Sequence, residues 1–509
     1  MARERFAFGP FLFDASRGTL VEHGLPVAIG SKALALLRAL VEARGQVVAK
    51  SALMDAAWPD TSVAESSLTV QIAALRKRLG VSPDSEDWIA TFPRVGYRFA
   101  GSLSVEEDET PAIHAQPSML GKELSIAVLP FRNLSSDPDQ EFFTDGLTED
   151  IITDLSNVPS FFVIARDSTF AFKGKPADVR QIAQSLGVKY ILEGSARRSA
   201  QRLRINVQLI DAAGGGNHVW AERFDRVLAD IFIVQDEIAR RVVEAITGKL
   251  AAFPVVEHYR PSSLEAYDLC VRARTVWTQD NASTQITQSL LERAIALDPG
   301  YCEVHWRLAM AHIHNWLHWG EPEESNRPHA IALAQRAVEL DPNDSSAHLA
   351  LGQILLYESR WDEAEVDYET AIRLNPNNAD ALAVFGDFKT LIGKPQEGVQ
   401  RAERALRLNP HPPHWYYWSL GFAQFANGQY DDAVWTLRRE ETYRTPTRRI
   451  LAAALAVLGR VSEAREEAKL FLSTSPHWRI SKWVESQPFK NPKDAQPWID
   501  AYRLAGLPE

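Results

Sequence analysis

The chain is poor in cysteine, with only Cys270 and Cys302 in 509 residues. So few cysteines exclude a disulfide framework and predict a reducing compartment. Long apolar runs are missing too, because Ile450–Leu458 is far shorter than the roughly 18 residues that cross a bilayer. The first residues are polar and basic and lack the pattern of a secretory signal. We therefore expect a cytoplasmic protein without a membrane partner.

Motifs for catalysis and for binding a phosphate are also scarce. Gly214–Gly216 lacks the following helix and lysine of a phosphate loop, and Lys173–Lys175 lacks the required spacing. The glycine run predicts a hairpin turn instead. Asp145, Glu149 and Asp150 lie near the start of a predicted helix, where carboxylates suit the helix dipole better than they suit catalysis. We expect no enzyme activity, no catalytic residue and no cofactor.

A histidine cluster follows Cys302 and comprises His305, His312, His314 and His318. The last two are spaced i, i+4, which is a spacing that can hold a metal ion. No matching ligands stand at fixed spacing elsewhere, so the pattern favours histidines packed among aromatic residues on a helix. We predict no metal site, and a role in sensing pH has no further support.

Length and charge predict several domains of different character. A chain of 509 residues suggests three or more domains. Residues 1–100 hold 12 Arg and Lys against 10 Asp and Glu, a net charge of +2, whereas the whole chain is −11. The remainder therefore carries −13. A nearly neutral first domain does not fit non-specific coating of nucleic acid, but it fits selective binding through a few clustered cations.

Residues 63–101 contain a helix-like run followed by a hairpin-like run. Leu68, Ile72, Leu75 and Leu79 recur at helical spacing and form one apolar stripe that must face a core. Ile89–Phe99 alternates and turns at a glycine, as a β-hairpin does. A helix of this kind fits the major groove of DNA, and a hairpin tip can contact the backbone or the minor groove.

The runs Leu75–Gly80 and Phe92–Phe99, together with the helix that starts at Lys32, closely resemble the OmpR-type winged-helix family of transcriptional regulators. The resemblance covers residues 5–101 and implies an α+β domain with a four-stranded leading sheet, three helices and a wing, here 1–101. By position it also implies a set of DNA contacts: Ser66, Ser67, Thr69, Val70, Gln71, Ala73, Ala74, Arg76, Lys77, Thr91, Arg94 and Arg98.

Two departures from the family pattern weaken the expected contacts. Ala73 and Ala74 stand where relatives often have long basic residues, and Arg94 is displaced by one from a commonly basic wing position. Alanine makes no bidentate base contact, although it can touch a thymine methyl group. We therefore expect modest affinity for one site, compensated by pairing of subunits on repeated half-sites.

Residues 102–123 include Glu106–Glu109, Pro111 and Pro117 and predict an acidic linker. Beyond it, residues 124–255 mix strands and helices. Ser125–Phe131 and Phe161–Ala165 predict buried strands, and Arg202–Asp211 alternates at period two. This stretch resembles the TolB amino-terminal-like domain, notably at Ala127–Phe131, Tyr190–Gly194 and Asp230–Glu237. The resemblance implies an α/β fold and a place between an effector module and helical repeats, without implying a reaction.

Residues 256–509 predict an all-α array. Pro342, Pro376 and Pro410 each end a similar motif and stand 34 residues apart, which is the period of a tetratricopeptide repeat. We expect five to six repeats and a capping helix around Trp498–Leu504. Stacked repeats form a superhelix whose groove receives peptides or helices of other proteins. Four contiguous aromatic residues cannot all face one core, so we expect some of them to bind a partner: Trp415, Tyr416, Tyr417 and Trp418.

The sequence therefore predicts a multidomain, bacterial, cytoplasmic DNA-binding regulator of transcription. Its partners would be double-stranded DNA, RNA polymerase, and either a protein or peptide in the repeat groove or a second copy in a homo-oligomer. Two alternatives stay open. The chain is a protein-interaction scaffold, or it is a signalling protein whose middle domain binds a nucleotide or small ligand.

Overall fold

The computed structural model describes most of the chain: residues 4–14, 19–22, 25–26, 31–58, 65–80, 87–93, 95–101, 103–107, 124–135, 137, 140–175, 178–199, 201–248, 260–277, 280–319, 321–439 and 445–509. These residues divide into two compact units, Met1–Pro117 and Ser118–Glu509. Each unit is described by itself. Across the described helices, none is long and apolar enough to cross a membrane.

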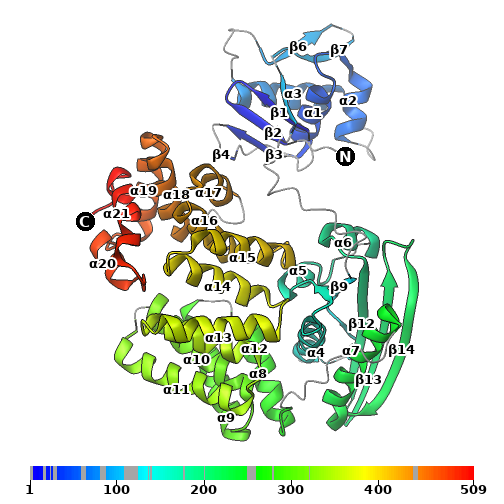
Figure 1. The fold of residues 1–509 in the computed structure, drawn as a ribbon. Helices are drawn as coiled ribbons and strands as arrows, with labels where there is room; N and C mark the ends of the chain where they lie inside the picture. The colour runs from blue at the N-terminus through cyan, green and yellow to red at the C-terminus, as the bar shows by residue number, and fades with distance from the viewer. Residues whose placement is uncertain are drawn as a thin grey trace. The chain divides into compact units, whose positions relative to one another are not determined.

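The first unit has two antiparallel sheets and three helices (Figure 1). The larger sheet has the order β4-β3-β2-β1-β8, and its strands are β1 (Glu4–Phe8), β2 (Phe11–Asp14), β3 (Thr19–Glu22), β4 (Leu25–Pro26) and β8 (Ser104–Glu107). The helices are α1 (Ser31–Glu42), α2 (Lys50–Ala57) and α3 (Glu65–Leu79). The smaller sheet has the order β5-β7-β6, with β5 (Val48–Ala49), β6 (Ile89–Phe92) and β7 (Gly96–Phe99). The predicted three helices and wing are confirmed, and the leading sheet has the four predicted strands together with β8.

An aromatic core joins the two sheets of the first unit. The rings of Phe8 and Phe11 on the larger sheet contact Trp88, with centroids 5.3 and 6.2 Å away, and Phe99 of the wing lies 4.9 Å from Phe8. The aromatic residues that alternate along the first strands therefore lie on the face of the sheet that packs into the core. Their burial stabilises the unit by roughly 1.5–3 kcal/mol for each large side chain.

The predicted linker is wrong at its start. Ser104–Glu107 form β8, which pairs antiparallel with β1, with Phe6 opposite Val105 and Arg5 opposite Glu106. Acidic residues that look like solvated linker in the sequence extend the edge of the leading sheet, where their backbone groups gain partners. Residues 108–123 lie outside the described part of the chain.

The second unit begins with a mixed sheet of order β11-β9-β12-β13-β14, with β10 (Arg132–Asn133) pairing β12 off this path. Its strands are β9 (Leu124–Val128), β11 (Phe161–Val163), β12 (Tyr190–Ser199), β13 (Arg202–Asp211) and β14 (Asn217–Val227). Helices α4 (Gln140–Ser156) and α7 (Ile231–Thr247) share one core with this sheet. Helix α6 (Val179–Leu186) packs on Ala127, Leu129 and Ile191 in a second core. The predicted α/β middle domain is confirmed.

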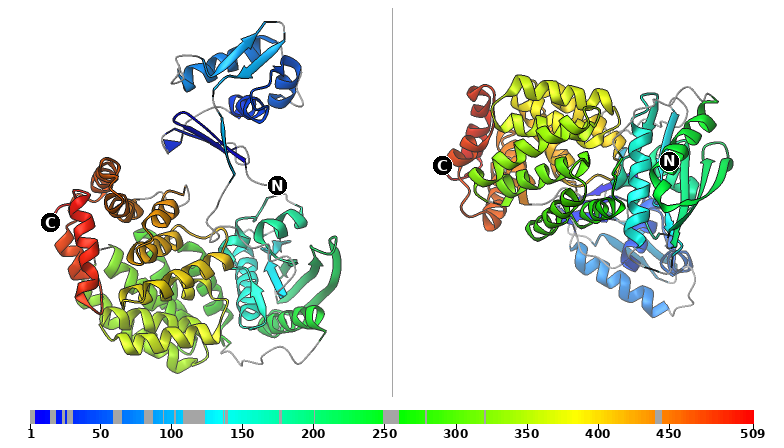
Figure 2. Two further views of the ribbon diagram at one scale, coloured as in Figure 1. Left: turned by 45° about the horizontal axis from the view of Figure 1, so that its top comes forward. Right: turned by 90° about the horizontal axis from the view of Figure 1, so that it is seen from below.

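Six antiparallel helix pairs follow in the described residues and stack in chain order (Figure 2). The pairs are α8 (Leu264–Val276) with α9 (Asn281–Leu297), α10 (Cys302–Trp319) with α11 (Glu323–Leu340), α12 (Ser345–Tyr357) with α13 (Trp361–Leu374), α14 (Ala379–Leu391) with α15 (Pro395–Leu408), α16 (Trp415–Ala426) with α17 (Tyr430–Leu437), and α18 (Thr445–Val457) with α19 (Val461–Thr474). Helices α20 (Ile480–Ser486) and α21 (Gln496–Leu504) close the array.

Small residues set the spacing within each pair. A Cβ on Gly352 of α12 would lie 3.3 Å from the carbonyl oxygen of Ala364 and 3.4 Å from the ring of Tyr368, both on α13. Tyr368 is fully buried there. This small-against-large contact is the one that the 34-residue pattern predicts, and the predicted repeat array and capping helix are confirmed.

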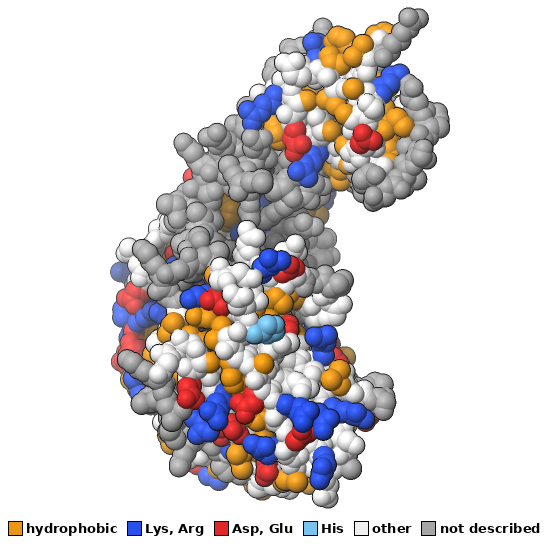
Figure 3. Space-filling view, turned by 90° about the vertical axis from the view of Figure 1, so that its right-hand side faces the viewer, with side chains coloured by type: hydrophobic (Ala, Val, Ile, Leu, Met, Phe, Trp, Pro, Cys, Tyr) orange, Lys and Arg blue, Asp and Glu red, His pale blue; other side chains and the backbone are white. Residues whose placement is uncertain are grey.

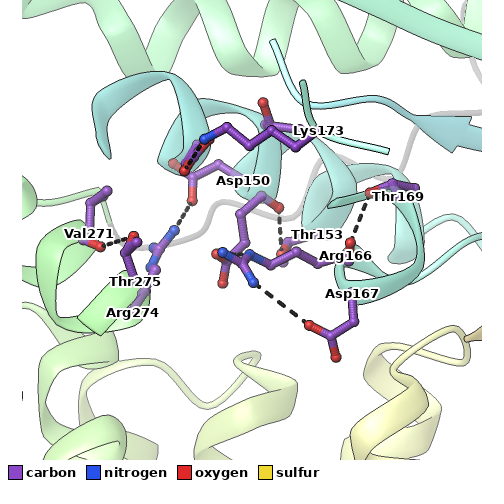
Figure 4. A network of polar contacts seen from close by, with 12 residues as sticks. Asp150, Thr153, Arg166, Asp167, Thr169, Lys173, Val271, Arg274 and Thr275 are labelled. Carbon is purple, nitrogen blue, oxygen red and sulfur yellow. Dashed lines mark hydrogen bonds and ion pairs between the residues drawn. The ribbon is translucent and has the colours of Figure 1, made fainter. Parts of the chain in front are cut away.

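A buried ionic network joins the middle domain to the first repeats (Figure 4). Arg274 of α8 is 6% exposed; its Nη1 lies 2.7 Å from Asp150 of α4, and it also pairs with Glu303 of α10. Arg307 of α10 pairs with Glu149 of α4 at 3.2 Å and with Glu303 at 2.6 Å. Burial alone would raise the pKa of Glu303, but Arg274 and Arg307 hold it well below its ordinary value.

Asparagine side chains make a second junction between the same two regions. Asn375 follows α13, and its Nδ2 donates to Ser156 Oγ of α4 at 2.8 Å. Asn377 Nδ2 donates to the carbonyl oxygens of Ser156 and Phe161 at 2.9 and 3.0 Å. One repeat later, Asn409 accepts from the hydroxyl of Ser168 at 2.5 Å. The middle domain and the repeats therefore belong to one compact unit.

Candidate nucleic-acid interface

Helix α3 has one buried face and one exposed face. Leu68, Ile72, Leu75 and Leu79 are at most 4% exposed and pack in the core of the first unit, with Leu36, Leu37 and Leu40 of α1. The predicted apolar stripe is confirmed. The opposite face is exposed and does not belong to this core.

The exposed face carries small, apolar and basic side chains. Val70 is 63% exposed, and the other exposed members are Thr69, Ala73, Ala74, Lys77 and Arg78. Basic residues occur in the last turn, where cations also suit the negative end of the helix dipole. Gly80 ends the helix with a φ of +66°, and its N–H donates to the carbonyl oxygen of Arg76 at 3.0 Å.

Arg76 lies on the flank of α3 and binds the wing strand. Its guanidinium donates to the carbonyl oxygen of Ile89 at 2.6 and 3.0 Å and to Thr91 Oγ1 at 2.6 Å. It also lies 3.8 Å from Asp87. These bonds use the donors that the sequence interpretation assigned to DNA, so Arg76 fixes the angle between α3 and β6. No local pattern indicates this role, because Arg76 and its acceptors on β6 lie 13 and 15 residues apart.

The wing is held close to the helical part by β5. A Cβ on Gly96 would collide with the carbonyl oxygen of Val48, so only glycine permits this pairing. Val95, at the hairpin tip, is 57% exposed. Arg98 is half-buried, and its guanidinium stacks 5.0 Å above the ring of Phe92.

The predicted DNA contacts thus fall into three groups. The exposed α3 face holds Thr69, Val70, Ala73, Ala74 and Lys77, while Thr91 is exposed on β6. Ser67, Gln71, Arg76 and Arg98 are half-buried on the flanks of α3 or on the wing. Arg94 and the side chain of Ser66 lie outside the described residues. No contact with nucleic acid is tested, and the set stays a prediction.

The aromatic run predicted to bind a partner is largely buried. Tyr416 is 1% exposed and its hydroxyl donates to Asp380 at 2.5 Å, and Tyr417 is 4% exposed beneath the guanidinium of Arg439. The prediction is wrong for these two tyrosines, because adjacent repeats pack on both sides of α16. Trp415 and Trp418 are half-buried, and their binding of a partner stays a prediction.

The histidine cluster is distributed over structural hydrogen bonds. His305 Nε2 lies 2.9 Å from the carbonyl oxygen of Pro299, and His314 Nδ1 lies 2.9 Å from that of Met310. Burial lowers the pKa of both rings. Over the described residues, no group of three or more His, Cys, Asp or Glu side chains is placed to hold a metal. The side chain of His318 is outside this description.

Three family models match separate parts of the chain. Residues 24–99 match "Transcriptional regulatory protein, C terminal", residues 122–241 match "HilA/YgeH-like transcriptional regulator, second domain", and residues 345–378 match "Tetratricopeptide repeat". The predicted winged helix and repeats are therefore confirmed as families as well as folds. The middle domain matches the HilA/YgeH-like model. Its likeness to the structure of TolB from Acinetobacter baumannii is partial, with 21% identity, a TM-score of 0.20, and 25% of this chain and 29% of that one covered.

Two curated relatives align over long stretches. "Putative adenylate cyclase 3" of Rhizobium meliloti is 47% identical over 264 residues, which are 50% of this chain and 44% of the relative. "Transcriptional regulator HilA" of Salmonella typhimurium is 24% identical over 371 residues, which are 71% of this chain and 63% of the relative. The matched stretch thus spans less than two thirds of the length of either relative.

Proposed function

We propose that this chain, which carries an OmpR-type winged helix, a HilA-like second domain and tetratricopeptide repeats, is a sequence-specific regulator of transcription that binds promoter DNA. The proposal rests on the two faces of α3, one buried in the core and one exposed. Its apolar stripe is fully used by the core, while Thr69, Val70, Ala73 and Lys77 remain exposed. This is the arrangement that a recognition helix requires in the major groove.

The side chains on that face define what kind of contact they make. Val70 and Ala73 offer apolar surface to thymine methyl groups, and Thr69 offers a hydroxyl to a base edge or a phosphate. Lys77 supplies a cation for the phosphate backbone at the end of the helix. The face holds few donors, so specificity rests on shape and methyl contacts, and affinity for a single half-site is modest.

In the same proposal, the second unit acts in the cytoplasm as the part that receives a partner. Tetratricopeptide arrays bind peptides or helices of other proteins, and Trp415 and Trp418 keep exposed surface on α16. RNA polymerase, another regulatory protein or a second copy of the chain would fit this role. The ionic network ties the middle domain to the array, so a partner on the repeats acts on both as one body.

Selection of DNA by the full chain from a random duplex library tests the proposal. We expect one enriched motif, and we expect Ala73→Glu to abolish its binding, because a carboxylate then faces the bases. Arg38→Glu on α1 is the control; it removes more positive charge from the domain, at an exposed site away from α3. No enriched motif, or equal losses in both variants, would refute sequence-specific binding.

The similarity to a protein named as an adenylate cyclase favours a second candidate, a signalling chain whose middle domain binds a nucleotide. Calorimetry of the full chain with ATP, combined with an assay for cyclic AMP, separates the two functions. We expect neither binding nor turnover. Micromolar ATP affinity or turnover would favour the second candidate over the first.

A further inference from the structure

The strand β14 forms a long open edge of the second unit's sheet. It spans 11 residues, Asn217–Val227, and within the described residues it pairs only with β13 (Figure 1). The register is interrupted once, opposite Leu209 and Ile210, and from Trp220 to Val227 it is regular. The strand contains no proline or glycine. An edge of this length exposes a row of backbone donors and acceptors that another strand can pair.

Charged residues surround the middle of this edge in a self-complementary order. The sequence from Glu222 to Arg226 is Glu-Arg-Phe-Asp-Arg. Suppose that a second, identical strand runs antiparallel to it with Phe224 opposite Phe224. Glu222 then lies opposite the other copy's Arg226, and Arg223 lies opposite its Asp225. Side chains directly opposite in an antiparallel pair approach closely enough for these charges to attract.

We propose that β14 pairs with β14 of a second copy of this chain, antiparallel and centred on Phe224, which joins the two sheets into one. A two-fold axis through Phe224 makes the contact self-complementary and closed, so it gives a dimer and not a filament. The surface lies in the middle domain. It is distinct from the exposed face of α3 and from the repeat array, and it does not depend on DNA binding.

Neighbouring registers are disfavoured by the same residues. Moving the centre by one residue places Arg223 opposite Arg223 or Asp225 opposite Asp225. Half-residue shifts place Glu222 opposite Asp225 or Arg223 opposite Arg226. A parallel pair in register would put every charge opposite itself. Like charges directly opposite each other destabilise strand pairing, so these residues disfavour the registers next to the one centred on Phe224.

The ion pairs that these residues make within one chain do not block the contact. Asp225 accepts from Arg204 at 2.6 Å and lies 3.0 Å from Arg223. Arg226 lies 3.5 Å from Glu237 of α7, and Glu222 lies 3.9 Å from Arg241 of the same helix. Most of these side chains are more than 40% exposed, so each pair is weak and can be shared with a second strand. Figure 3 views the side of the molecule on which β14 lies, where basic and acidic side chains are interspersed.

Sedimentation equilibrium of the full chain without DNA tests the proposal. We expect a dimer whose dissociation constant rises at least about tenfold in Arg223→Asp, because two attractive pairs become two repulsive ones. Adding Asp225→Arg restores complementarity with the charges exchanged and should return the constant close to its original value. Arg197→Asp is the matched control; it makes the same charge change at an exposed residue of β12, away from the edge.

A second exchange, Glu222→Arg with Arg226→Glu, makes the same test if the first variants do not fold. A chain that is monomeric at all concentrations would overturn the proposal. A dimer indifferent to Arg223→Asp, or one that the exchanged pair fails to restore, would also overturn it. Because DNA is absent, these outcomes are independent of whether α3 binds a promoter.

Discussion

Basic side chains have different surroundings in the two units. On α3 the basic side chains of Lys77 and Arg78 lie on an exposed face, whereas Arg274 and Arg307 in the second unit are largely buried between carboxylates of α4 and α10. The buried arginines hold two regions of one chain together, and their charge is fully compensated. The exposed cations are set apart from the core of their domain. The second unit therefore uses these arginines within the chain, whereas the proposed function assigns the exposed cations of the first unit to an anionic partner.

Arg274→Ala should give the largest effect, since it leaves Asp150 and Glu303 buried without their shared cation. Breaking a buried pair in this way costs about 3–5 kcal/mol. We expect the unfolding transition of the second unit to shift sharply downward in calorimetry, with the first unit's transition unchanged. Arg336→Ala, at an exposed i, i+3 pair on α11, is the control and should change stability by less than about 0.5 kcal/mol. Equal effects would contradict the structural role of the network.

Arg76→Ala tests an exception to this comparison. Arg76 is a basic residue of α3, but like Arg274 and Arg307 it bonds to groups of its own chain. Its bonds to Ile89 and Thr91 fix the wing, and their loss should lower the first unit's stability by about 1–2 kcal/mol. DNA affinity would fall as a consequence of the displaced wing. A variant with unchanged melting temperature but weaker DNA binding would show instead that Arg76 contacts DNA directly.

Asn375→Asp tests the second junction. The substitution keeps the oxygen that accepts from the N–H of Asn377, but it removes the donor to Ser156 and adds a charge in a buried site. We expect a loss of about 1–2 kcal/mol in the second unit, measured by chemical denaturation. Asn281→Asp, an exposed position at the start of α9, makes the same change without this contact and should be nearly neutral.

The sequence revealed the elements of both regions but only part of their contacts. The stripe from Leu68 to Leu79 predicted which face of α3 is buried, because helical periodicity is local. The 34-residue prolines predicted the array for the same reason. By contrast, Asp150 and Arg274 stand 124 residues apart, and no local pattern records that they meet. The sequence placed Asp145, Glu149 and Asp150 near the start of a helix, but α4 begins at Gln140 and the last two lie in its middle. Glu149 and Asp150 pair with Arg307 and Arg274 of the repeats, and these partners depend on how the middle domain packs against the array.

The residue before the final proline of each repeat motif does indicate the junction with the middle domain. The repeat turns contain Asp298 and Asp341 in two cases and Asn375 and Asn409 in the other two. All four positions suit a turn, but only asparagine also donates a hydrogen bond. The two asparagines use this donor toward the middle domain, Asn375 to Ser156 and Asn409 to Asp167. The aromatic run in α16 predicted more partner-binding surface than the structure has. Contiguous aromatic residues can be buried when neighbouring repeats pack on both sides of their helix.

Asp387 of α14 is a buried carboxyl group whose hydrogen-bond partner is a serine and not an arginine. Burial raises its pKa to about 7, although Ser419 donates to it at 2.5 Å. The folded chain thus holds this proton more tightly than the unfolded chain, whose group titrates near 3.8. Stability should fall as the pH rises between these values. Asp387→Asn should flatten that slope and raise the melting temperature at pH 8 by about 2–4 °C. Asp362→Asn, at an exposed carboxylate, should not.

Lys77→Ala should have the smallest effect, and it isolates the exposed cations of the first unit. If Lys77 neutralises one phosphate, its removal should weaken DNA binding only a few-fold and similarly for all sequences. The slope of log affinity against log salt should fall by about 0.9. The melting temperature should stay unchanged, because the side chain is exposed and does not belong to the core. Lys32→Ala on α1 removes an equivalent exposed charge and should leave the slope as it was. Equal slopes in the two variants would place the DNA backbone away from the end of α3. Lys77 would then have no part in binding DNA, and the proposed difference between the cations of the two units would not hold for it.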